Sequence, residues 1–284
     1  LSSTSAVSRG VRIPEYPSTR SMFQSSAVAR LCVLIAAGQV GSAAPTARRV
    51  EFPSALEVAF ADLFAGTPKA VHAVQFGLRE EGALLLTGVP GLRAVRPEAL
   101  QAAAACASSQ ASASVHLPDG SARQTVKLSG EVLNASLADA GGSRPSWPLL
   151  QRCPDLLAAV SGLRATVRMA ARSVAAAVDQ GKTSVYQLTE VVDRGDHLEQ
   201  LHIYEPSSDA GANLGSGKGL LEDSDEVAID WHTDAGVLLG MVADPENSGD
   251  LLVQMSSGET VRTRIKDGAV LFLVGEGAAA WLPG

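Results

Sequence analysis

The chain has 284 residues, with 23 Lys and Arg against 30 Asp and Glu, so its formal net charge is −7. Apolar residues make up 46% and charged residues 19%, which excludes a wholly disordered chain and allows one large domain or two small ones. The acidic balance, without a stripe of Lys and Arg, argues against nucleic-acid binding, because phosphate contacts need clustered cations. Three cysteines are too few for a disulfide scaffold.

The amino-terminal residues predict a targeting leader. Residues 1–21 are rich in Ser, Pro and Arg, and we interpret them as disordered or as translated sequence upstream of the true start. Residues 22–44 run from Met22 through a polar stretch to the apolar run 31–37 and then to small residues, the layout of a secretory signal. This run is too short to span a bilayer, and no other segment predicts a membrane span. Organelle leaders share this pattern, so we expect the secretory pathway or an organelle; the alternative is an Ala-rich first helix of a cytoplasmic protein.

The cysteines bear on the same question of compartment. Cys32 would leave with the leader, so that Cys106 and Cys153 would remain. Two thiols suffice for one disulfide, and the sequence leaves open whether these two meet.

Residues 45–195 carry mostly helical signals. Thr67 followed by Pro68 is a good helix start, and Gly82 and Gly181 are good stops. We predict helices over residues 54–64, 68–81, 97–109 (opened by a proline) and 154–180, a buried strand over 83–89, and loops with a hairpin within 115–148.

The pattern changes at about residue 196, where short apolar runs separated by Gly, Asp, Asn and Ser replace the helices. We predict strands over residues 197–204, 227–232, 237–242, 251–255, 259–265 and 270–274. Helices followed by many short strands are typical of an α+β domain. We therefore expect a helical amino-terminal part, residues 45–195, packed on a double-stranded β-helix (jelly-roll) core, residues 196–284.

His232 and Asp234 form the strongest candidate for a chemical site. They lie two residues apart at the end of a predicted strand, so both side chains point to the same face. A neutral nitrogen ligand beside an anionic oxygen ligand is two-thirds of the facial triad that holds non-haem Fe(II). The tripeptide alone is a weak signal, since a surface histidine and a turn aspartate produce the same letters by chance.

The surroundings of this motif resemble the isopenicillin-N-synthase-like Fe(II)/2-oxoglutarate dioxygenases. That family has an Asn-Tyr-Tyr-Pro-Pro type strand before a His-Thr-Asp-X-Gly motif; here residues 202–206 (His-Ile-Tyr-Glu-Pro) precede residues 232–236 (His-Thr-Asp-Ala-Gly). Residues 76–90 are similar to the family's amino-terminal helix-to-strand segment, and the resemblance covers residues 52–284. The family's later strands are matched in order by residues 237–239, 250–254, 258–261, 267–272, 275–276 and 282–284.

This resemblance implies roles for four residues. His232 and Asp234 match the first two iron ligands, and Tyr204 matches the tyrosine whose hydroxyl helps to hold the distal carboxylate of 2-oxoglutarate. His202 stands where the family often has an asparagine near the cosubstrate; the alternative is a buried strand histidine bonded to the backbone. The implied cofactor is Fe(II), the cosubstrate 2-oxoglutarate, and the reactants O2 and a small molecule. The aspartate of the motif favours hydroxylation or desaturation over halogenation.

Part of the family pattern has no counterpart here. The family's third iron ligand, a histidine, and its oxoglutarate-binding arginine follow the turn that residues 283–284 resemble, and no histidine follows His232. We therefore expect a fragment of a longer parent, with a jelly roll incomplete at its last strands and with little or no turnover.

Two classes of function follow. The first hypothesis is an Fe(II)/2-oxoglutarate-dependent dioxygenase, for the parent protein, that acts as a monomer on a small molecule. The alternative is a non-catalytic oxygenase-fold binding protein that lacks a complete iron site. A site for a different metal on a cupin-like barrel agrees less well with the sequence, because the spacing of residues after His232 does not match that of such a site.

Overall fold

The computed structural model describes residues 31–38, 50–109, 114–117, 121–129, 152–181, 187–195, 197–205, 232–248 and 251–280. Its strands are β1 (Leu31–Gly38), β2 (Val50–Glu51), β3 (Glu57–Ala59), β4 (Ala83–Thr87), β5 (Val115–His116), β6 (Ala122–Ser129), β7 (Leu198–Glu205), β8 (Leu238–Ser248), β9 (Leu251–Gln254), β10 (Thr260–Thr263) and β11 (Val270–Val274). Its α-helices are α1 (Phe60–Phe64), α2 (Pro68–Phe76), α3 (Leu92–Ser109), α6 (Leu156–Asp179) and α7 (Leu188–Arg194). Shorter turns are the 3-10 helices η1 (Ser54–Leu56) and η5 (Glu276–Ala280) and the π-helical turn η2 (Gly77–Glu81).

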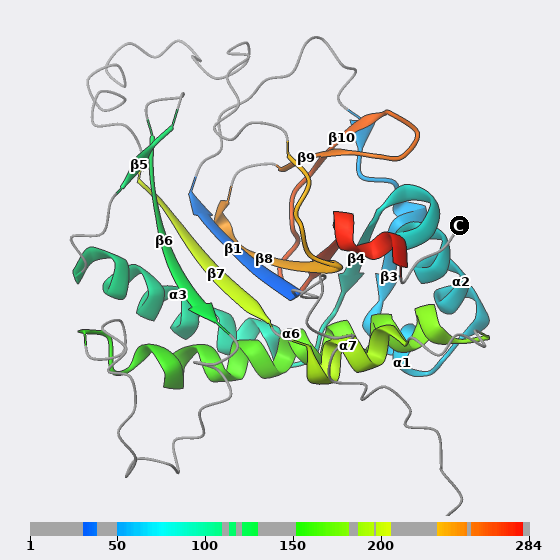
Figure 1. Ribbon diagram of the computed structural model, residues 1–284, viewed down its shortest axis with the longest axis horizontal. Helices are drawn as coiled ribbons and strands as arrows, with labels where there is room; N and C mark the ends of the chain where they lie inside the picture. Colours follow the sequence, from blue (N-terminus) through cyan, green and yellow to red (C-terminus); the bar gives the residue numbers. More distant parts are fainter. Residues whose placement is uncertain are drawn as a thin grey trace, which may run out of the picture.

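Two sheets and a layer of helices make up the described part of the chain (Figure 1). The larger sheet has eight strands in the order β3-β4-β11-β8-β1-β7-β6-β5, and the smaller sheet has three in the order β2-β10-β9. Helices α3 and α6 lie along one face of the larger sheet, and the smaller sheet packs on the opposite face. This mixed helix-and-sheet architecture confirms the predicted combination of amino-terminal helices with a later β-rich part.

The central helix of the helical layer is α6. Its apolar residues recur at the helical period and are buried against the large sheet and the neighbouring helices, which confirms the helix predicted over residues 154–180. Gly181, with φ of 79°, follows the end of the helix as predicted. The buried positions include Leu156, Val160, Leu163, Val167, Val174 and Val178.

A second apolar core lies between the two sheets. The larger sheet supplies Leu85, Leu239, Met241 and Leu271, and the smaller sheet and its loops supply Val253, Met255, Val261 and Ile265. We call the face of the large sheet that borders this core the inner face. The buried residues that the large sheet supplies to this core lie on β4, β8 and β11.

The carboxy-terminal strands agree with the sequence prediction. Strands β7 to β11 correspond to five of the six predicted runs, and Gly258, with φ of 83°, forms the turn between the antiparallel strands β9 and β10. The sixth run, residues 227–232, lies outside the described residues except for its last position. The predicted hairpin is present as β5 paired with β6.

The helix predicted over residues 54–64 is confirmed only in its last part, which forms α1, and is wrong for residues 54–59. The segment divides into η1, β3 and α1, and β3 pairs parallel with the buried strand β4. Val58 is buried in the core, and Glu57 binds Lys266 with Nζ–Oε1 of 2.6 Å. These tertiary contacts of an edge strand outweigh the local helical preference. Residues 45–195 consequently contain strands as well as helices.

Helices α3 and α2 differ in how well their starts were predicted. The helix predicted to open at Pro97 begins at Leu92 instead, after Gly91 with φ of 77°. Arg96, which is buried, binds Asp267 with Nη1–Oδ1 of 2.8 Å, so contacts with the β-rich part hold the first turns of α3. Helix α2 begins as predicted, with the Ala70 N–H donating to Thr67 Oγ1 at 3.4 Å.

Helix α7 has no counterpart among the predicted elements, and an aspartate from another helix caps it. Both carboxylate oxygens of Asp179, the last residue of α6, accept bonds from the first turn of α7: Leu188 N–H and Thr189 N–H, each at 2.9 Å. A cap supplied from outside the helix leaves no local signature in the α7 sequence.

Residues 31–38, the centre of the predicted leader, form β1 in the middle of the large sheet. This strand runs parallel to both neighbours, with Cys32 aligned with Leu198 of β7 and with Leu239 of β8. The leader over residues 22–44 stays a prediction, and it competes with this pairing because a removed segment cannot complete a sheet. None of the described helices combines the length and apolar character needed to cross a bilayer.

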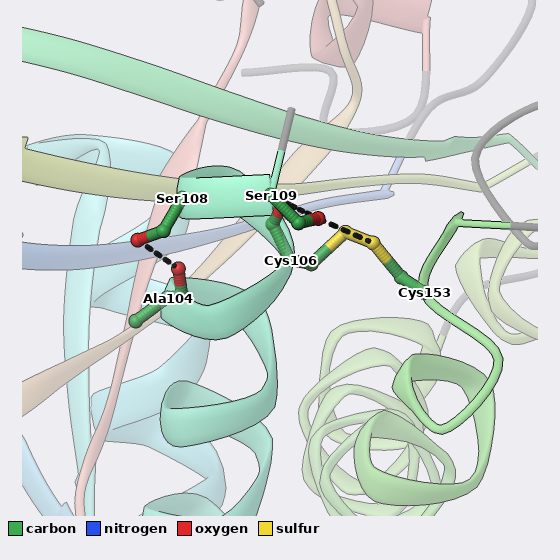
Figure 2. Close-up of a disulfide and its surroundings, with 5 residues drawn as sticks. All are labelled: Ala104, Cys106, Ser108, Ser109 and Cys153. Carbon is green, nitrogen blue, oxygen red and sulfur yellow. Dashed lines mark hydrogen bonds between the residues drawn. A yellow bond between two sulfur atoms is a disulfide. The ribbon is translucent and has the colours of Figure 1, made fainter. Parts of the chain in front are cut away.

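Cys106 and Cys153 form a disulfide (Figure 2), which answers the question, left open by the sequence, of whether these two cysteines meet. The Cα atoms are 5.4 Å apart, and the bond joins the last turn of α3 to the residues just before α6. The Ser109 hydroxyl donates to the Cys106 carbonyl at 2.8 Å and lies 3.7 Å from Cys153 Sγ. The disulfide thus fixes the two helices of the helical layer to each other.

Candidate functional site

The polar part of the inner face is built by β6 and β7, which pair antiparallel. The register aligns Thr125 with His202 and Arg123 with Tyr204, so these four side chains project from one face of the sheet. Leu201 of β7 projects from the other face into the helical core. Alternation along the two strands therefore separates an apolar face from a polar one.

Burial and a hydrogen bond from a neighbouring strand fix the side chain of His202. It is buried, and its Nδ1 lies 2.8 Å from the Thr125 hydroxyl oxygen. Burial, with the nearby cations Arg123 and Lys127, lowers the pKa of His202 to about 4, so the ring is neutral at neutral pH. The partner of the ring is thus a side-chain hydroxyl, where the sequence interpretation offered the backbone as the alternative.

Tyr204 lies beside His202 on the same strand face. The two ring centroids are 6.3 Å apart, and the tyrosine is buried. The structure therefore brings together both residues that the resemblance placed near a cosubstrate.

Arg123 is a polar residue of the inner face that the sequence interpretation missed. Its Nε is buried and has no hydrogen-bond partner among the described residues. A buried guanidinium N–H without an acceptor lowers the stability of the fold, and an anion bound next to it would supply the missing acceptor. The signal was available in the alternation Arg123, Thr125, Lys127 along one strand, but it becomes visible only when β6 is known to pair with β7.

The other predicted pair, His232 and Asp234, lies in the segment that leads into β8. The Asp234 carbonyl accepts from the Glu276 N–H at 2.8 Å, and the Gly236 carbonyl accepts from the Gly277 N–H at 3.0 Å. His232 is exposed and Asp234 half-buried. The backbone of the motif is thus fixed against the start of η5.

Gly275 makes this close approach possible. A Cβ added there would lie 2.2 Å from the Gly236 carbonyl oxygen and 2.5 Å from that of Asp234, distances that real Cβ atoms do not adopt. Only glycine fits, because the obstacle is backbone and not a flexible side chain.

The structure places the two predicted pairs at different levels of the sheet. Leu239 and Leu198 both align with Cys32, so β7 and β8 start level, whereas His202 and Tyr204 lie in the second half of β7. Within the described ranges, no group of three or more His, Cys, Asp and Glu side chains is placed to hold a metal ion. His232 and Asp234 therefore stay predicted ligands.

A cavity of about 790 Å³ lies elsewhere, on the outer side of the helical layer. Its wall comes from α1, α2, α6 and α7 and includes the exposed Phe64 together with Met169, Arg168 and Arg172. It contains none of the residues that the sequence selected.

Comparison with known proteins finds similarity in structure alone. No family model matches the sequence, and no curated protein matches it. A protein from Caulobacter crescentus assigned to the 2OG-Fe(II) oxygenase family has a TM-score of 0.56 at 14% identity, covering 84% of this chain and 79% of its own. A full-length protein from Neurospora crassa, in complex with alpha-KG, has a TM-score of 0.54 at 15% identity, covering 79% of this chain and 74% of its own.

A third similar structure is the Arabidopsis thaliana dioxygenase for auxin oxidation 1 in complex with 2-oxoglutarate, with a TM-score of 0.51 at 12% identity, covering 79% of this chain and 81% of its own. The chain has the fold of 2-oxoglutarate and Fe(II) oxygenases. This agrees with the predicted jelly-roll class.

Proposed function

We propose that this protein is a non-haem Fe(II)/2-oxoglutarate-dependent oxygenase that acts on a small molecule. The observation that carries the proposal is the His-Thr-Asp-Ala-Gly segment, fixed directly before β8 in a chain whose fold is that of such oxygenases. The isopenicillin-N-synthase-like branch, and hydroxylation or desaturation as the reaction, are finer parts of the same proposal and rest on the sequence resemblance.

The residues present fit the groups that this function requires. The His232 imidazole and the Asp234 carboxylate are donors that Fe(II) accepts. The buried, unpartnered Nε of Arg123 beside Tyr204 fits an anionic cosubstrate on the inner face. When bound, iron and 2-oxoglutarate supply the oxidising chemistry, and the chain's own residues hold and orient them.

Low turnover by the 284-residue chain is part of the proposal. His232 and Asp234 are the two iron ligands that the resemblance implies, and a site that lacks one ligand of three holds the metal and its cosubstrate more weakly. The alternative function is that of a non-catalytic binding protein with the oxygenase fold that lacks a complete iron site.

The compartment is a further part of the proposal. A disulfide between Cys106 and Cys153 persists in an oxidising environment, which supports the secretory pathway or an oxidising organelle. We further propose that the protein acts as a monomer, without nucleic acid as a partner.

Metal binding by His232 and Asp234 is tested with Mn(II), a redox-stable stand-in for Fe(II), followed by electron paramagnetic resonance of the free ion. We expect His232→Ala and Asp234→Ala each to weaken Mn(II) binding at least about tenfold, in line with losses at metal sites. His116→Ala, which removes an exposed histidine of β5, is the matched control and should bind as the unaltered chain does. Equal binding by all four proteins would overturn the proposed metal site.

A further inference from the structure

The cavity on the outer side of the helical layer has the size and the lining of a small-molecule site. Its volume of about 790 Å³ lies within the range of roughly 300–1,000 Å³ that is usual for ligand pockets. Helices α1 and α2 supply Leu63, Phe64 and Val71 to its wall, and α6 supplies Met169. We call this cavity the outer groove.

Two apolar side chains of the outer groove are open to solvent. Phe64 is 76% exposed, although its ring stacks on that of Phe60 with the ring centroids 5.8 Å apart, and Met169 is 38% exposed. They are two of the four large apolar side chains that are exposed in the described part of the chain. Because they share one cavity instead of being scattered singly, they indicate a place where an apolar group binds.

Three arginines follow one another at intervals of four residues along α6, which places them on the same side of the helix. Arg164 binds Glu199 of β7 through Nε–Oε1 at 2.5 Å and Nη2–Oε2 at 3.1 Å. Arg172 binds Asp193 of α7 with Nη2–Oδ2 of 3.3 Å. The first and the last arginine of the row therefore each have a carboxylate partner.

Arg168, the middle arginine of the row, has no carboxylate partner among the described residues. It is half-buried, and its Nη2 donates to the backbone carbonyl of Asp193, which is a neutral acceptor. Within the described ranges, Asp193 is the one acid that lines the outer groove, and its carboxylate binds Arg172. The groove thus has two guanidinium groups against one carboxylate, and Arg168 keeps N–H donors for a ligand.

The groove is less suited to an anion at the carboxy-terminal end of α6. Gln75 of α2 donates from Nε2 to the carbonyls of Ala177 and Gln180, at 2.9 and 3.3 Å, and both of these residues line the groove. The end of a helix also carries a partial negative charge. An anion in the groove is therefore favoured at Arg168, in the middle of α6, and not at the end of the helix.

We propose that the outer groove binds a small amphipathic carboxylate, a molecule with one acid group and an apolar chain or ring. The carboxylate accepts from Arg168, and Arg172 lies one turn further along the helix. The apolar part packs on Phe64 and Met169. One negative charge on the ligand matches the one excess positive charge of the groove. The inference does not rest on the proposed function, because the groove lies outside the helical layer and needs no iron.

Binding is tested on the metal-free 284-residue chain, in the presence of a chelator, by NMR of the methionine methyl groups. Octanoate is the probe, and 1-octanol is its uncharged counterpart. We expect octanoate to give a saturable shift of the Met169 methyl resonance. Met241 and Met255, which are buried in the core between the two sheets, should keep their resonances. The uncharged 1-octanol should bind at least about tenfold more weakly, because it makes no charge-assisted contact.

Variants of Arg168 test the charge. Arg168→Gln should weaken octanoate binding at least about tenfold. Arg168→Lys keeps the charge without the planar fork, so its affinity should fall between that of Arg168→Gln and that of the unaltered chain. The matched control is Arg152→Gln, which removes an exposed arginine that precedes α6 and does not line the groove, and it should leave the affinity unchanged.

A variant that fills the groove guards against loss of folding in Arg168→Gln. Ala165 is exposed and lines the groove, so Ala165→Trp adds bulk there and removes no side-chain hydrogen bond. It should abolish octanoate binding while thermal unfolding stays cooperative. Unchanged affinity in Arg168→Gln and Ala165→Trp, equal binding of the two probes, or no shift of Met169 would overturn the inference. A shift of Met169 with protein concentration, without probe, would assign the groove to contact between copies of this chain and would also overturn it.

Discussion

At the residue scale, His202 shows how the sheet sets the chemistry of a single side chain. Its position on β7 puts it among β6 side chains that no local pattern around residue 202 could identify. The sequence could predict that His202 and Tyr204 share a face, since they are two residues apart on a strand. It could not predict Thr125 as the partner of the ring or Arg123 as the neighbour of Tyr204, because both depend on the register of β6 against β7.

His202 predicts a pH dependence of stability. Its pKa in the folded chain is about 4 and its ordinary pKa is 6.5, so the unfolded chain takes up the proton first as pH falls. The contribution of His202 is therefore complete above about pH 6.5 and is lost as pH falls toward 4, by up to about 3 kcal/mol. Urea unfolding of the unaltered chain and of His202→Gln across this range measures the difference. Parallel pH profiles for the two proteins would contradict the assignment.

The ion pair between Arg164 and Glu199 predicts a one-sided loss of stability. Burial raises the pKa of Glu199 even though Arg164 opposes the shift. Arg164→Met leaves the carboxylate without its partner and should lower the free energy of unfolding by about 3–5 kcal/mol. The double variant Arg164→Met/Glu199→Gln should recover part of this loss in chemical denaturation. A double variant less stable than the single one would be inconsistent with a buried, paired charge.

Gly275 predicts a link between packing and metal binding. Gly275→Ala must displace the backbone at residues 234–236, and we expect a loss of about 2 kcal/mol or more together with weaker Mn(II) binding. Gly277→Ala, whose Cβ would lie 3.1 Å from the Gly236 carbonyl oxygen, is the graded control and should cost less. Thermal unfolding and Mn(II) titration measure both effects; full stability in Gly275→Ala would show that the segment is not fixed as described.

At the element scale, the sequence predicted the elements whose signals are local. The apolar period of α6, the cap before α2 and the alternating runs of β7 to β11 lie within their own segments. The wrong or missing predictions concern segments whose structure depends on residues far away in the sequence. Strand β3 forms because β4 lies beside it, and α7 begins where Asp179 accepts its first N–H groups.

The disulfide between α3 and α6 predicts a dependence of stability on oxidation. Its cysteines are 47 residues apart in the sequence, and closing such a loop stabilises the folded state by about 4 kcal/mol in the chain-entropy account. A reducing agent should lower the midpoint of thermal unfolding by several degrees, and Cys106→Ser/Cys153→Ser should unfold at the lower temperature with or without the agent. Two free thiols from these positions in the oxidised protein, located by mass spectrometry after alkylation, would contradict the pairing.

At the scale of the whole molecule, the large sheet separates two environments. One face packs against the helices through an apolar core. The inner face packs against the small sheet through apolar residues of β8 and β11, and it carries polar side chains on β6 and β7. The sequence indicated the β-rich core and its helical covering from the order of the elements. It could not indicate β1 as a central strand, because an apolar run of this length is typical of leaders and of buried strands alike.

The proposed Fe(II)/2-oxoglutarate site can be tested by anaerobic titration of the chain with Fe(II) and 2-oxoglutarate, followed by absorption spectroscopy. We expect the charge-transfer absorption of the iron–oxoglutarate chelate, weak but saturable, to be lost in His232→Ala and retained in His116→Ala. The absence of this absorption from the unaltered chain, or its persistence in His232→Ala, would overturn the proposed site.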